Sequence, residues 1–71
     1  MIRKEQIKTM GKAQLRQLVR PVSVKYVTPI INETIAKQRG VSLEFAKKQK
    51  IVFQKEVIII LDFLGFEYEP L

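Results

Sequence analysis

The sequence predicts one small, mostly helical domain of three helices, with a short strand as an optional addition. The chain has 71 residues, which is enough for a single domain. Helix start and stop signals at Thr28-Pro29, Gly40 and Gly65 divide it into segments in which apolar residues recur at helical spacing. No cysteine or histidine is present, so no disulfide and no thiolate metal site supplements the core.

The first expected helix covers residues 3–19 and is stopped by Arg20-Pro21, because the residue before a proline avoids the helical region. A basic residue recurs at every fourth position along this segment, as Lys4, Lys8, Lys12, Arg16 and Arg20. On a helix such a basic band brings like charges together, at a cost of roughly 0.2–0.5 kcal/mol for each pair. The band therefore indicates a polyanionic partner, and the alternative is a solvated face that keeps the domain in solution.

A short strand is predicted over 22–27, where Val22, Val24 and Tyr26 alternate with polar residues. The next segment begins at Thr28-Pro29, with Thr as the N-cap and Pro at the first helical position, and a left-handed Gly40 is expected to end it. Residues 29–39 are thus the second expected helix.

The third expected helix runs continuously over 43–64, from a cap at Ser42 to a stop at Gly65. A strand over Val57 to Phe63 is the competing interpretation, because that stretch is rich in β-branched residues. As a helix, the segment is apolar on most of its sides and needs more cover than 71 residues provide. This need for cover predicts a homodimer.

The charge is concentrated at the N-terminal end. The chain carries a net +6, and residues 1–20 contribute +5 of it, from six basic side chains and one acidic one. Such an asymmetry is typical of a chain in which one end meets nucleic acid or an anionic surface.

The stretch from Ile35 to Ser42 resembles the centre of a helix-turn-helix DNA-binding domain. Ala36 stands where the two helices cross, Gly40 turns the chain, and Val41 and Ser42 open the second helix. The resemblance implies that the major groove of DNA is faced by the start of that second helix, namely by Ser42, Leu43, Glu44, Lys47 and Lys48.

A ribbon-helix-helix arrangement is a second DNA-binding possibility. It would pair the strand over 22–27 with its copy in a dimer and use Ser23 and Lys25 to read bases. The long first helix departs from that layout, which places this interpretation below the helix-turn-helix.

No constellation of catalytic residues is visible, because the easiest general base, metal ligand and thiolate nucleophile are all missing. We therefore predict a cytoplasmic, homodimeric DNA-binding protein with a regulatory or architectural role, without enzymatic activity and without a cofactor or metal. The main alternative is a protein–protein interaction module, such as an inhibitor or assembly factor, that binds through its apolar C-terminal helix. An N-terminal helix lying on an anionic membrane ranks last.

Overall fold

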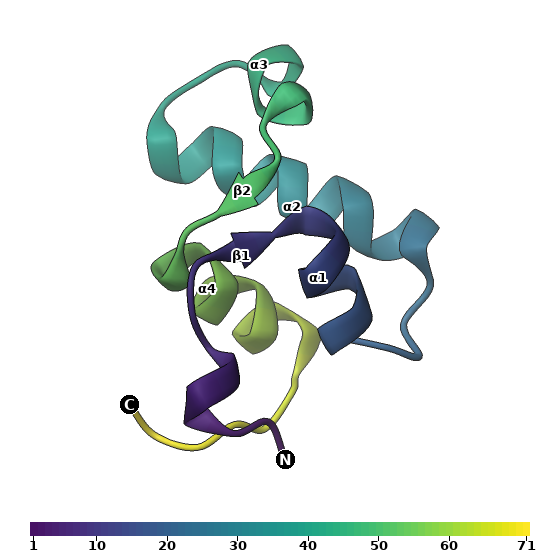
Figure 1. The fold of residues 1–71 in the computed structure, drawn as a ribbon. Helices are drawn as coiled ribbons and strands as arrows, with labels where there is room; N and C mark the ends of the chain where they lie inside the picture. The colour runs from purple at the N-terminus through teal and green to yellow at the C-terminus, as the bar shows by residue number, and fades with distance from the viewer.

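The computed structural model describes residues 1–71 and confirms a mostly helical protein (Figure 1). It has four α-helices where three were predicted, together with a two-stranded sheet that was not predicted. The elements in chain order are the 3₁₀ turn η1 (Lys4–Gln6), β1 (Met10–Gly11), α1 (Lys12–Leu18), α2 (Val24–Arg39), α3 (Leu43–Lys48), β2 (Ile51–Val52) and α4 (Gln54–Leu64). No helix combines the length and the apolar character needed to cross a bilayer.

The hydrophobic core lies where α1, α2 and α4 meet around the small sheet (Figure 1). Its 13 buried apolar residues include Leu15 of α1 and the one-turn series Val27, Ile31 and Ile35 of α2. From α4 it takes Val57, Ile60 and Leu61. The 3.6-residue period places each of these sets on one side of its helix, and this is why the three helices pack together.

The prediction of a first helix over 3–19 is wrong at its N-terminal half. Met10 and Gly11 form β1, which pairs antiparallel with Val52 and Ile51 of β2, and the helix begins only at Lys12. Glycine is a poor helix former. In the extended conformation, the backbone of Gly11 forms hydrogen bonds with the partner strand in place of those within a helix.

The predicted strand over 22–27 and the predicted helix start at Thr28-Pro29 are also wrong. α2 already begins at Val24, after an extended Ser23, and Pro29 lies inside it. The early start buries Val27 one turn before Ile31, which the alternating pattern did not suggest. Pro29 has no N–H, so the carbonyl of Lys25 is left without its helical donor.

The predicted continuous helix over 43–64 is two helices, α3 and α4, separated by Gln49 to Phe53. Ile51 and Val52 leave the helix to form β2. The stretch from Val57 to Phe63 is helical, so the choice of helix over strand there is confirmed. Three phenylalanines of this region, Phe45, Phe53 and Phe63, are exposed.

The turn between α2 and α3 follows the predicted chemistry. Gly40 ends α2 in the left-handed conformation, with φ 65° and ψ 38°. The backbone N–H of Val41 donates to the carbonyl of Ala36 at 3.1 Å, and the hydroxyl of Ser42 accepts from the N–H of Phe45 at 3.1 Å. Both predicted caps are confirmed.

We expect Gly40→Ala to lower the free energy of unfolding by about 1 kcal/mol, the usual cost of a left-handed residue that carries a Cβ. No heavy atom lies within 4 Å of a Cβ built there, so the cost comes from the backbone alone. The matched control is Gly11→Ala, because Gly11 has a φ of −73° and its Cβ would meet only the Lys50 carbonyl at 3.8 Å. Urea unfolding should show a change within about 0.5 kcal/mol for the control; equal losses for both variants would contradict the argument.

The two ends of the chain lie together at one end of the molecule (Figure 1). Ile2 forms a parallel bridge with Tyr68, in which the N–H of Ile2 donates to the Glu67 carbonyl at 3.1 Å and the N–H of Glu69 donates to the Ile2 carbonyl at 2.9 Å. The C-terminal segment is thereby part of the fold.

Candidate functional site

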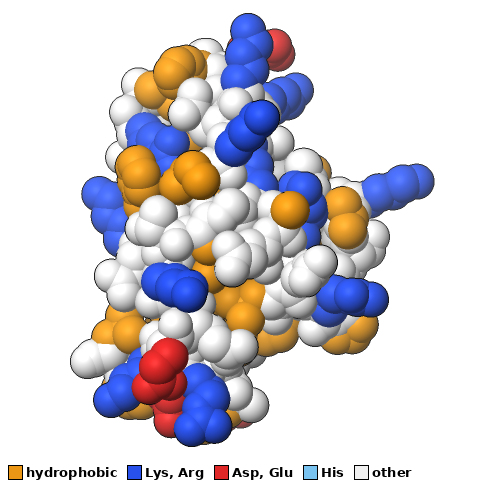
Figure 2. All heavy atoms as spheres, in the orientation of Figure 1, with side chains coloured by type: hydrophobic (Ala, Val, Ile, Leu, Met, Phe, Trp, Pro, Cys, Tyr) orange, Lys and Arg blue, Asp and Glu red, His pale blue; other side chains and the backbone are white.

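A hollow of about 760 Å³ opens between α1, α2 and the segment that joins α3 to β2. Five of the residues that line it are basic and none is acidic: Lys12, Arg16, Lys47, Lys48 and Lys50. We call this feature the basic hollow. In Figure 2, Lys and Arg side chains outnumber acidic ones over the upper part of the molecule, where α3 lies.

The two-stranded sheet assembles the basic hollow from distant parts of the chain. The pairing of β1 with β2 is extended by the N–H of Lys12, which donates to the Lys50 carbonyl at 2.9 Å. The first turn of α1 is therefore fixed beside the end of α3. Arg16 follows Lys12 by one helical turn, so both side chains are directed to the same side of α1.

Lys12 forms the floor of the hollow and is held by the protein itself. Its ammonium donates to the side-chain oxygen of Asn32 at 2.6 Å and to the carbonyls of Ala46 and Lys47 at 2.9 and 3.4 Å. Burial lowers the pKa of Lys12 below its usual value, and the positive charges of Arg16 and Arg39 lower it further. Lys12 therefore contributes charge to the hollow, while its donors are committed to joining α1 to α2 and α3.

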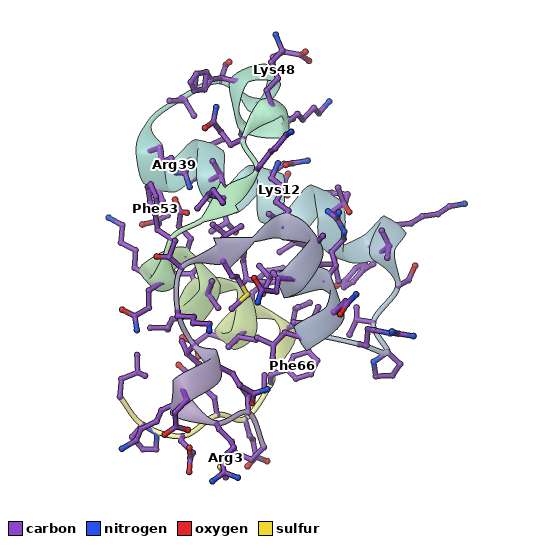
Figure 3. All side chains as sticks on the ribbon, viewed as in Figure 1. Arg3, Lys12, Arg39, Lys48, Phe53 and Phe66 are labelled. Carbon is purple, nitrogen blue, oxygen red and sulfur yellow. The ribbon has the colours of Figure 1, made fainter.

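The rim of the hollow carries the cations that remain free to bind a ligand. Lys47, Lys48 and Lys50 are exposed and Arg16 is half-buried. The ammonium of Lys47 lies 3.9 Å from the carboxylate of Glu44, and an exposed ion pair of this kind contributes little to stability. The rim can therefore neutralise several anionic groups of one ligand at once. Lys48 lies at the tip of α3, with Lys12 nearer the centre of the molecule (Figure 3).

The basic band of the sequence does not form one helical ridge. Lys4 belongs to η1 and Lys8 to the stretch before β1, and neither lines the basic hollow. Arg20 follows α1 and lines a neighbouring hollow of about 550 Å³, to which Arg16 also contributes. Of the five residues of the band, only Lys12 and Arg16 share a helix and the hollow.

The residues predicted from the helix-turn-helix resemblance divide into two groups. Lys47 and Lys48 line the basic hollow. Ser42 uses its hydroxyl to cap α3, and Leu43 and Glu44 are exposed on the first turn of that helix, outside the hollow.

Two features of this region escaped the sequence analysis. Lys50 joins the rim because β2 follows α3 directly, which a continuous helix would have prevented. The second feature is a buried ion pair between Arg39 and Glu56, in which the guanidinium donates to both carboxylate oxygens, at 2.8 and 2.9 Å. Its only sequence signal is Glu56 three residues after Phe53, at the position from which a side chain can reach back to the start of a helix.

The chemistry available to the hollow is the binding of anions. No group of histidine, cysteine, aspartate or glutamate side chains in the structure is arranged to hold a metal ion. Lysine and arginine side chains on a concave surface bind phosphate groups through charge and N–H donors. No protein-family model, curated protein or solved structure matches this chain.

Proposed function

We propose that the protein binds double-stranded DNA, with the rim of the basic hollow on the phosphate backbone and α3 directed to the major groove. The observation that carries the proposal is the convergence of five basic side chains, from segments far apart in the sequence, on one hollow without an acidic residue. Like charges are costly to bring together, and a polyanion removes that cost.

The phosphate contacts would come from Arg16, Lys47, Lys48 and Lys50. Contacts of this kind position a protein on the duplex without reading its sequence. Arg16 can engage two phosphate oxygens through its planar guanidinium, whereas the lysines act as mobile point charges.

Base contacts would come from the first turn of α3, as the resemblance to helix-turn-helix domains implies. Glu44 is exposed there, and Lys47 follows on the next turn. A glutamate side chain can accept a hydrogen bond from cytosine N4. A regulatory or architectural role follows from such binding.

The test is fluorescence anisotropy with a random-sequence DNA duplex at several salt concentrations. A rim variant, Arg16→Gln/Lys48→Gln/Lys50→Gln, should bind at least tenfold more weakly at low salt. Each lost phosphate contact should reduce the slope of log K against log salt by about 0.9, so three losses would reduce it by up to about 2.7.

The matched control is Lys4→Gln/Lys8→Gln/Lys55→Gln, which removes the same net charge from exposed positions outside the hollow. We expect its DNA affinity to change by less than about threefold, because salt screens the attraction between DNA and charges outside the binding surface. Equal losses for the two variants would show that net charge, and not the hollow, governs binding. No binding by the wild type at low salt would refute the proposal.

A further inference from the structure

A second hollow, of about 430 Å³, lies between α2 and α4 and is mainly apolar. Five apolar side chains line it: Ile30, Ala36, Leu43, Ile59 and Phe63. We call it the α2–α4 groove. Three of these are exposed although they are large, with 68% of Phe63, 42% of Leu43 and 37% of Ile59 accessible to solvent.

The groove exists because α4 is apolar on two sides. Val57, Ile60 and Leu61 occupy the side that packs into the core. Ile59 and Phe63 are one turn apart on another side and reach no covering element. An apolar patch of this kind, with polar residues at its edge, is typical of a surface that binds another protein.

We propose that the α2–α4 groove is the surface through which two copies of this chain pair about a twofold axis. The local charge favours a second copy as the occupant. The chain carries +6 overall, whereas the groove is lined by one acidic and one basic residue, Glu33 and Lys37. Two copies of a cationic protein repel each other least where the facing surfaces are close to neutral.

The same two residues make the face complementary to itself. Glu33 and Lys37 are one turn apart on α2, and neither takes part in an ion pair within the chain. If the two α2 helices pack antiparallel across the axis, Glu33 lies beside Lys37 of the partner subunit, and the contact occurs twice. Phe63 would then be the buried aromatic anchor that protein interfaces favour.

Pairing through this groove is compatible with ligand binding in the basic hollow. The α2–α4 groove and the basic hollow have no lining residue in common. A dimer would therefore expose two basic hollows related by the twofold axis.

The test is sedimentation equilibrium of the purified chain without nucleic acid, so its failure would leave the DNA-binding proposal standing. The wild type should show a monomer–dimer equilibrium. Glu33→Lys and Lys37→Glu should each raise the dimer dissociation constant roughly tenfold or more, because each turns two attractive contacts into repulsive ones. The double variant Glu33→Lys/Lys37→Glu should return it to within about threefold of the wild type.

Phe63→Ser should remove the dimer, whereas Phe45→Ser, an exposed phenylalanine outside the groove, should leave it unchanged. Circular dichroism confirms that each variant is folded before its mass is measured. A wild type that stays monomeric into the millimolar range overturns the proposal and leaves the groove to a different protein. A dimer that tolerates both single reversals, or that the double variant fails to restore, also overturns it.

Discussion

Arg39→Met is expected to lower the free energy of unfolding by about 3–5 kcal/mol, the usual cost of leaving a buried charge without its partner. The carboxylate of Glu56 is fully buried, and Arg39 is its only cationic partner. A domain of this size has a total stability near the lower end of the common range of about 5–15 kcal/mol. The variant should therefore retain little of its stability.

The loss is large because the ion pair joins three parts of the fold. The guanidinium at the end of α2 also donates to the Ile51 carbonyl in β2 at 2.8 Å, and it lies 4.1 Å from the ring centre of Phe53. The same carboxylate accepts the backbone N–H of Phe53 at 2.8 Å, which fixes the start of α4. Figure 3 shows Arg39 and Phe53 beside each other.

Two further variants separate the charge effect from simple loss of packing. Arg39→Met/Glu56→Leu should recover a large part of the loss, because replacing a whole buried ion pair by apolar residues is often neutral. Arg39→Lys should lie between, since a lysine cannot make the two parallel hydrogen bonds. Urea unfolding followed by circular dichroism measures all three. A double variant no more stable than Arg39→Met would contradict the explanation.

The parts of the fold that sequence predicts correctly are those fixed by local chemistry. Gly40 and Ser42 act through their own backbone conformation and hydroxyl, so they could be assigned without knowing the rest of the protein. Gly65 likewise ends α4 in the left-handed conformation.

The parts that sequence misses depend on partners far along the chain. Met10-Gly11 and Ile51-Val52 each lie in a segment whose apolar residues recur at helical spacing, and their mutual pairing makes both extended. That single pairing shortens the first helix and divides the last one. Arg39 and Glu56, 17 residues apart, come together for the same reason, because β2 returns the chain to the end of α2.

The candidate site shows the same division. Lys12, Arg16, Lys47 and Lys48 could be singled out from local charge and from the helix-turn-helix resemblance. Their meeting in one hollow depends on the sheet, which sequence did not reveal. Lys12 also joins α1 to α2 and α3 through its hydrogen bonds, a structural role that its position in the basic band did not predict.

The second large effect is expected at that residue: Lys12→Met should lower the free energy of unfolding by about 2 kcal/mol. It leaves the side-chain oxygen of buried Asn32 and the carbonyl of Ala46 without their donor, at about 1–3 kcal/mol for an unsatisfied buried group. The melting temperature should fall by roughly 10 °C. Lys8→Met, at an exposed lysine, is the control and should change stability by less than about 0.5 kcal/mol.

The pH dependence of the Lys12 contribution separates the effect of its charge from that of its N–H donors. Because the pKa of Lys12 is lowered in the folded state, the unfolded chain binds more protons at this site between the lowered pKa and the ordinary lysine pKa of about 10.4. Wild-type stability gains from this site as pH rises through that window, and the variant gains nothing. The difference in the free energy of unfolding between the two proteins should therefore widen towards pH 10 and be constant below the window.

Tyr68 also titrates in this range, because its pKa is raised chiefly by its hydrogen bond to Asp62. Its raised pKa lowers the stability as pH rises, but equally in both proteins, so this contribution cancels in the difference. A difference that stays flat across the window would mean that burial does not disfavour the charged form of Lys12 in the folded state.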